Sequence, residues 1–186
     1  AGPIMVTGTL KRIFLIFIVL MPLLNFIHEA GHWAGYKLCG VPVTVKFQRV
    51  AAERTGNKNA GIIGNWSGPA VNFLIAGMAL MYPQQLAVAG LSAASHRLSA
   101  QAFGLPLYCA GRTKFTNDET LLFPENTRLF VCLIFILVYG ALSLKFCRAL
   151  GLTTIPLRAG AIILGVALWL GYGLLLMWLD KIMLKM

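Results

Sequence analysis

The pattern of hydrophobic positions along the chain predicts four long apolar helices. Each apolar segment is long enough to cross a bilayer. The segments cover residues 13–38, 68–88, 127–148 and 157–180. Lys11 and Arg12 precede the first and Lys181 follows the last, as is typical at the level of lipid headgroups. We therefore expect an all-α, multi-pass integral membrane protein, folded as a single membrane-embedded domain over residues 1–186.

After the first segment, the pattern changes to the period of a strand. Gly40 and Pro42 are expected to end the helix, and apolar and polar residues then alternate over residues 41–50. Charged, Gly and Asn residues at 51–59 are typical of a turn, with a return strand expected at 60–63. Such a membrane-associated β-hairpin would have an edge able to pair with an extended peptide, and an ordinary interfacial hairpin fits the pattern equally well.

The second apolar segment and the stretch after it contain several polar residues. Pro69 is expected in the first turn of its helix, and Asn72 is a polar residue that needs a partner on another helix or a bound peptide. Residues 86–103 are rich in Ala with polar residues interspersed, which favours an interfacial or re-entrant helix. His96 beside Arg97 is then expected at the headgroup level rather than as a metal ligand.

Composition excludes an ordinary soluble domain. Hydrophobic residues make up 58%, charged residues only 12%, and the mean hydropathy is +0.76. The net charge of +10 reflects the scarcity of acids, of which there are six. Basic side chains are expected among lipid headgroups. The sequence has no run of basic residues with aromatic residues between them, so we expect no nucleic-acid binding. We expect the first apolar run to be a retained span rather than a cleaved signal.

The first apolar segment contains the one motif with recognisable chemistry, H-E-x-x-H. On a helix, His28 and His32 lie on one face, close enough to share a metal ion, and Glu29 lies where it can act on metal-bound water. Gly31 and Gly35 give this part of the helix a small-residue surface, which would let another helix approach closely. Ionisable residues inside a membrane helix are costly, so they indicate function.

A catalytic zinc usually has three protein ligands, so a third must come from elsewhere in the chain. His96 is one candidate. Glu53 lies in a charged loop and Asp180 at the end of the last helix, where both are most simply surface groups. The remaining candidates lie just before or at the start of the third apolar segment and are Asp118, Glu119 and Glu125.

Together with G-P-A-V-N at residues 68–72, the H-E-x-x-H helix resembles the site-2 protease family of intramembrane zinc metalloproteases, peptidase family M50. In that family, a later helix begins with an N-x-x-P-x-x-P-x-D-G motif, whose Asp is the third zinc ligand and which is often followed by Arg. Asn117 matches the Asn of this motif, Glu125 falls at the Asp, and Arg128 at the Arg. The resemblance covers residues 13–146.

The resemblance implies a zinc endopeptidase that hydrolyses a peptide bond within or near a transmembrane segment, as in regulated intramembrane proteolysis. Zinc would be held by His28, His32 and Glu125, with Asp118 as the alternative third ligand. Glu29 would be the general base, and Asn72 would hold the substrate backbone or an oxyanion. The expected partners are a transmembrane protein substrate, the lipid bilayer and a regulatory membrane protein, with no nucleic acid.

Two other functions stay open at this point. In the first, the chain is a catalytically degenerate relative that serves as a scaffold or assembly subunit of a membrane complex, and its motif residues only pair with one another and with Asn72 or Arg128. In the second, a transporter or channel uses His28, Glu29 and His32 as an ion pathway, although the last apolar segment has almost no polar residues to line one. The positive charges divide equally between the two sides, so the positive-inside rule assigns no orientation.

Overall fold

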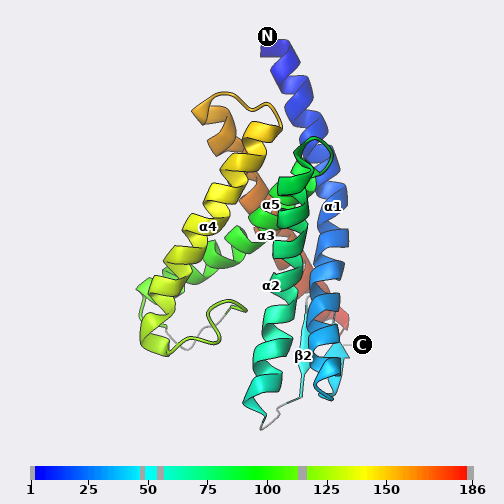
Figure 1. The fold of residues 1–186 in the computed structure, drawn as a ribbon, viewed down its shortest axis with the longest axis vertical. Helices are drawn as coiled ribbons and strands as arrows, with labels where there is room; N and C mark the ends of the chain where they lie inside the picture. The colour runs from blue at the N-terminus through cyan, green and yellow to red at the C-terminus, as the bar shows by residue number, and fades with distance from the viewer. Residues whose placement is uncertain (1–2, 47–48, 54–56, 113–116, 184–186) are drawn as a thin grey trace.

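Helices make up most of the described chain. The computed structural model describes residues 3–46, 49–53, 57–112 and 117–183. The elements in chain order are α1 (Pro3–Leu38), β1 (Val43–Val45), β2 (Val50–Ala52), α2 (Lys58–Met81), α3 (Pro83–Cys109), the 3-10 turn η1 (Glu125–Thr127), α4 (Arg128–Ala149) and α5 (Ile155–Met183). This confirms the expected all-α class with a small β-hairpin after the first helix (Figure 1).

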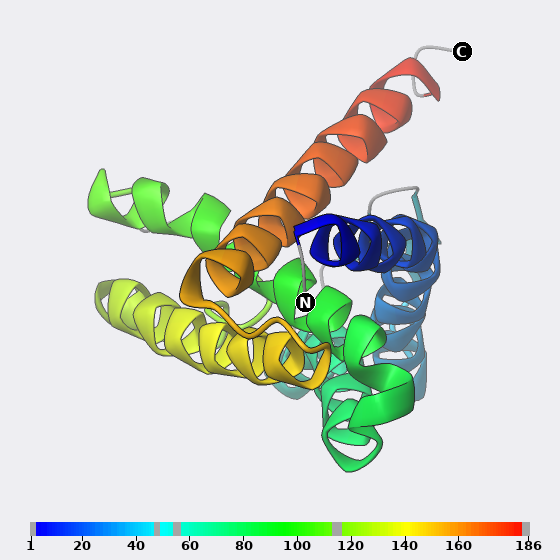
Figure 2. The same ribbon diagram turned by 90° about the horizontal axis from the view of Figure 1, so that it is seen from above.

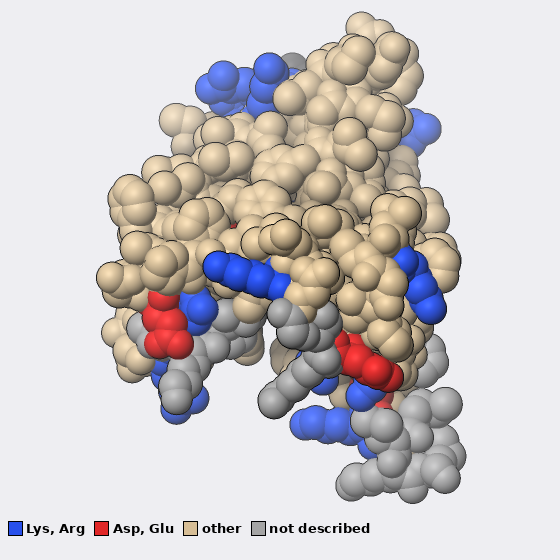
Figure 3. Space-filling view, turned by 60° about the horizontal axis from the view of Figure 1, so that its bottom comes forward, with Lys and Arg blue, Asp and Glu red and all other residues tan. Residues whose placement is uncertain are grey.

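Three helices are long and apolar enough to cross a membrane. The qualifying segments are Leu10–Leu38, Glu125–Ala149 and Ile155–Ile182. Large apolar side chains on them face outward, including Val19 and Leu137, each 74% exposed, as suits contact with lipid. On the face seen in Figure 3, a broad area without charged side chains lies between charged groups above and below it. These features are compatible with a membrane protein, and four spans stays a prediction.

Helix α3 lies among the other helices and contacts α1, α2, α4 and α5 (Figures 1 and 2). Leu91, Ser92 and Ser95 are fully buried on it, and a Cβ on Gly90 would lie 2.6 Å from the Ala79 Cβ. Residues 86–103 are helical and buried, and their interfacial or re-entrant placement stays a prediction. The small, weakly polar side chains of this stretch allow helices to approach closely, so it is packed inside the bundle.

The hairpin is shorter than expected and closes earlier in the chain. Strands β1 and β2 are antiparallel, with Val43 opposite Ala52 and Val45 opposite Val50. Residues 47–48 of the expected strand lie outside the described residues. Helix α1 ends as predicted, because Gly40 has a φ of +70°, the left-handed conformation that favours glycine just after a helix.

Helix α2 begins well before Pro69, so the expected return strand at residues 60–63 is wrong. Asn57 caps the helix, because its side-chain oxygen accepts hydrogen bonds from the backbone N–H groups of Asn59 and Ala60. Pro69 consequently lies inside the helix rather than in its first turn. The apolar segment at 68–88 also includes a helix boundary, since α2 ends at Met81 and α3 begins at Pro83, with only Tyr82 between them.

Glycines bring α1 and α2 together, as the sequence predicted. A Cβ on Gly31 would lie 2.7 Å from the Ser67 carbonyl oxygen, and a Cβ on Gly64 would lie 2.3 Å from the Tyr36 ring. Neither position has room for a side chain, because Gly31 meets the backbone of α2 and Gly64 meets the Tyr36 ring, so the two helices pack closely. This contact places the H-E-x-x-H face of α1 directly against α2.

Replacing Gly31 with Ala is expected to lower the thermal unfolding midpoint in detergent micelles. The added methyl group meets a backbone carbonyl that cannot rotate away, and overpacking of this kind costs about 1–3 kcal/mol. Gly140→Ala on α4 is the matched control, because a Cβ there has nothing within 4 Å. Equal midpoints for the two variants would contradict the tight α1–α2 contact.

Candidate metal centre

The two motif histidines converge on one point beside α1. His28 and His32 are 3% and 6% exposed, and their Nε2 atoms lie 3.1 Å apart. Their rings meet edge to face, with centroids 4.7 Å apart. The one-turn spacing predicted from the sequence therefore puts both imidazoles on the same face of α1, with the same ring nitrogen directed inward.

Contacts with α2 and α3 define which ring nitrogens carry lone pairs. The Nδ1 of His32 lies 2.8 Å from the Gly64 carbonyl oxygen, and because a carbonyl can only accept, this nitrogen carries the hydrogen. The Nε2 of His28 lies 3.2 Å from Nη1 of Arg97, which can only donate. Both Nε2 atoms are thus acceptors when the rings are neutral. The His28 lone pair accepts from Arg97, so a metal ion held by both Nε2 atoms would take the place of this hydrogen bond.

Gly68 makes room for the His32 ring. A Cβ on Gly68 would lie 2.3 Å from the His32 Nε2. The small residue in the G-P-A-V-N stretch therefore has a direct structural role at this site. His28 has no matching support, because its buried Nδ1 has no hydrogen-bond partner within the described chain.

Asp118 supplies the third converging atom. Its Oδ2 lies 3.4 Å from the His28 Nε2 and 3.5 Å from the His32 Nε2. Ligands about 2.0–2.1 Å from a tetrahedral zinc are separated by about 3.3 Å. The three atoms form a triangle with sides of 3.1, 3.4 and 3.5 Å, which fits three corners of such a site.

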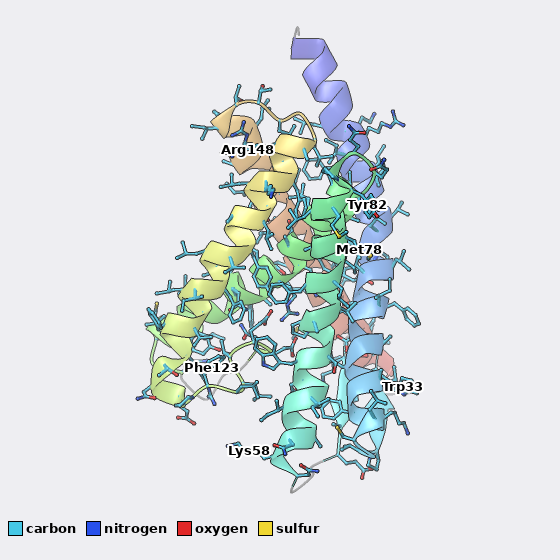
Figure 4. All side chains as sticks on the ribbon, in the orientation of Figure 1. Trp33, Lys58, Met78, Tyr82, Phe123 and Arg148 are labelled. Atoms are coloured by element: carbon cyan, nitrogen blue, oxygen red, sulfur yellow. The ribbon has the colours of Figure 1, made fainter. Side chains whose placement is uncertain are left out.

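The structure does not bring Glu125 to these histidines. Glu125 is exposed in η1 and is not among the described residues that line the cavity around them. Phe123, close to Glu125 in the chain, lies on the α4 side of the molecule, away from α1 (Figure 4). Asp118, the alternative from the sequence, is the acid that lies there. The motif alignment followed chain order and could not show how residues 117–124 fold back against α3.

A compact turn holds Asp118 in place. The Asn117 side-chain oxygen accepts from the Thr120 N–H at 3.0 Å, and the Thr120 hydroxyl oxygen accepts from the Asn117 N–H at 3.1 Å. This reciprocal arrangement is that of a capping box. Tyr108 of α3 lies 2.6 Å from the same hydroxyl, and Asn117 donates to Gln101 at 2.9 Å. The turn is therefore tied to α3 on both sides of Asp118.

A buried ion pair between Arg97 and Glu119 anchors the same turn, and sequence reasoning missed it. Arg97 is 3% exposed and Glu119 is 0% exposed. Arg97 donates from Nε to Glu119 Oε1 at 2.7 Å and from Nη2 to Oε2 and to Asp118 Oδ2, the last at 3.0 Å. Tyr139 and Gln101 also donate to Glu119, at 2.9 and 3.1 Å. The sequence feature that could have indicated this pair is Arg97, the one charged residue of the segment 83–109, together with the neighbouring acids Asp118 and Glu119 later in the chain.

Asp118 is a carboxylate in this setting. Burial by itself would raise its pKa, but the Arg97 guanidinium and the two histidines hold the pKa of this carboxyl well below its usual range. With Glu29 and Glu119, the cluster has three carboxyl groups and one guanidinium. Fully ionised, it has two excess negative charges, which a divalent cation would balance.

Glu29 lies beside the histidine pair and contacts the hairpin. The ligand atoms of His28, Glu29 and His32 all lie within 4.8 Å of one another, so this group could hold a metal ion. The Glu29 Oε2 accepts a hydrogen bond of 2.7 Å from the Val50 N–H on β2. This hydrogen bond fixes the carboxylate beside the histidine pair.

Asn72 is buried and does not line the cavity among the described residues. It is 2% exposed, and its Nδ2 lies 3.1 Å from Nδ1 of His96. His96 itself lines the cavity, and its expected place at the headgroup level stays a prediction. The polar residue predicted on α2 thus has its partner on α3.

These groups open onto one cavity of about 780 Å³. One side consists of the motif residues of α1, of Arg97 and of Asp118, and Val50 of β2 borders it. Apolar residues of α5, including Leu174 and Met177, form the other side. The volume and the mixed lining are those of a ligand-binding site.

No family model, curated protein or solved structure matches the chain. The geometry of the site therefore carries the functional argument.

Asp118→Ala is expected to weaken zinc binding as strongly as His28→Ala or His32→Ala. Each removes one of the three converging candidate ligand atoms, so, if they hold the ion, the loss should exceed the roughly 10- to 100-fold typical of a change outside the ligand set. Competition with a fluorescent zinc chelator measures the dissociation constant. Glu125→Ala is the control and should bind as the wild type; the reverse ranking of Asp118 and Glu125 would refute this ligand set.

Glu119→Leu is expected to destabilise the fold by about 3–5 kcal/mol, because it leaves the buried Arg97 guanidinium without its main counter-charge. Denaturant unfolding in mixed micelles, followed by tryptophan fluorescence, measures the change. The exposed Glu53→Leu should stay within about 0.5 kcal/mol of the wild type. A Glu119→Leu protein of unchanged stability would contradict the anchoring role.

Proposed function

We propose that the chain is an intramembrane zinc metalloprotease of the site-2 protease type, which hydrolyses a peptide bond within or near a transmembrane segment. The observation that carries the proposal is the convergence of His28 Nε2, His32 Nε2 and Asp118 Oδ2, 3.1–3.5 Å apart, beside Glu29. Two imidazoles and a carboxylate are a donor set that suits zinc with one position left open.

In this proposal, His28, His32 and Asp118 hold the ion. A bound zinc would supply Lewis-acid polarisation of a carbonyl and would lower the pKa of water at the site. The chain contributes the fixed donor geometry. The Gly64 carbonyl accepts a hydrogen bond that orients His32, and Arg97 donates one that orients Asp118. Metal ligands usually have supporting hydrogen bonds of this kind.

Glu29 is the general base. Its carboxylate takes a proton from the attacking water as the new bond forms between the water oxygen and the carbonyl carbon. The same proton then passes to the amide nitrogen as the C–N bond breaks, so the products are a carboxylic acid and an amine. The hydrogen bond from Val50 to Oε2 orients the side chain for this role.

The substrate is a segment of a membrane protein in an extended conformation. A helix shields its peptide bonds, so the scissile region must unwind, and its freed backbone groups then need partners in an apolar setting. Val50 of β2 borders the cavity, and its N–H donates to Glu29, so the two-stranded sheet lies beside the place where these backbone groups need partners. The partners under this proposal are the substrate, the bilayer and a regulatory membrane protein.

A second candidate function is a metal-free scaffold or assembly subunit, and one observation favours it. The Arg97 guanidinium already bonds to Asp118 and to the His28 Nε2. A positive charge is therefore present at the cluster without an ion. The scaffold function requires purified wild type with no bound zinc and no protease activity.

Glu29→Gln is expected to lower the rate of cleavage of a membrane substrate by at least about 100-fold, the usual contribution of a general base. Its zinc content should equal that of the wild type, because the ligands are untouched. The assay uses zinc-loaded protein and a library of single-span proteins reconstituted in liposomes, with products identified by mass spectrometry.

Glu53→Gln, in the loop after β2, is the matched control and should cleave normally. Retained activity in Glu29→Gln would refute the general-base role. A wild-type protein that binds no zinc and cleaves no library member would refute the proposed function and favour the scaffold.

A further inference from the structure

His96 is held in one orientation at the wall of the cavity. Its ring stacks on Trp169 of α5, with centroids 4.0 Å apart and planes at 16°. Its other neighbour is the His28 ring, 4.9 Å away and nearly perpendicular, at 73°. The imidazole is therefore held between His28 of α1 and Trp169 of α5, which both line the cavity.

Asn72 selects the tautomer of this ring. Its Nδ2 lies 3.1 Å from the His96 Nδ1, and an amide nitrogen can only donate. The Nδ1 is therefore an acceptor, and the hydrogen of the neutral ring is on Nε2. No hydrogen bond to this Nε2 is found within the described chain, which leaves its N–H available to a molecule in the cavity.

His32 has the opposite arrangement. Its Nδ1 donates to the Gly64 carbonyl oxygen, so its Nε2 has a lone pair, as in most metal-bound histidines. His96 receives a hydrogen bond at Nδ1 and presents an N–H instead. The two rings line the same cavity. The hydrogen bond at Nδ1 leaves His32 with a lone pair on Nε2 that suits a cation, and it leaves His96 with an N–H on Nε2 that can donate to an oxygen.

We propose that the His96 Nε2–H donates a hydrogen bond to the carbonyl oxygen of the scissile peptide as negative charge develops on it, and that Asn72 is the residue that positions this donor. The inference rests on the proposed function and adds a catalytic residue to it. A preorganised donor at this oxygen stabilises the transition state more than the ground state. Asn72 then acts through His96 instead of contacting the substrate.

Histidine NMR tests the tautomer independently of any activity. The chain contains three histidines, so full-length protein labelled with ¹⁵N-histidine and studied in micelles gives three imidazole spin systems. We expect His96 protonated at Nε2 and His32 at Nδ1, with the His96 signal assigned from its loss in His96→Phe. In Asn72→Leu, His96 should populate both tautomers. A wild-type His96 protonated at Nδ1 would overturn the inference.

Kinetics tests the role in catalysis. His96→Phe keeps an aromatic ring against Trp169 but has no N–H, so kcat should fall by about 10²–10³-fold while KM and zinc content stay near wild type. Asn72→Leu should lower kcat in the same direction but less, and Asn59→Leu, exposed on the same helix, should have no effect.

Unchanged kcat in His96→Phe would overturn the inference and leave the proposed function standing. Absence of cleavage by the zinc-loaded wild type would instead remove the proposed function, and with it the catalytic role of His96. The NMR result would then show separately whether Asn72 selects the tautomer.

Discussion

The buried ion pair between Arg97 and Glu119 is the interaction on which the arrangement of the site depends. Moving either charge out of water is costly, and the pair is tolerable only because nearly every donor and acceptor is used. Glu119 accepts from Arg97, Gln101 and Tyr139, so one carboxylate joins α3, α4 and the turn at residues 117–120. Asp118 directly precedes Glu119 in that turn, and its position beside the histidines follows from this anchoring.

The close contact of α1 with α2 is the second constraint. Close packing of small residues brings the two helices together. Gly31 lets the backbones meet, Gly64 leaves space for the Tyr36 ring, and Gly68 leaves space for the His32 ring. The Gly64 carbonyl then accepts from the His32 Nδ1, so the contact between α1 and α2 also leaves the lone pair of His32 on Nε2.

Polar chemistry in this chain is concentrated at one place. Of the six acids, Glu29, Asp118 and Glu119 all belong to the cluster around the histidines, in a protein whose charged residues total 12%. All three histidines line the same cavity. Burying this many ionisable groups in an apolar bundle is costly, and such groups are retained in membrane proteins mainly for function.

The sequence by itself determined the features that depend on local periodicity. The long apolar helices α1, α4 and α5, the end of α1 at Gly40, and the shared face of His28 and His32 all follow from the spacing of residues along one element. Tertiary structure decided what requires contact between distant segments. It brought Asp118 rather than Glu125 to the histidines, buried α3, and paired Asn72 with His96. The physical reason is that a carboxylate, a guanidinium and an amide are directed by partners far away in the chain, and periodicity contains no information about those partners.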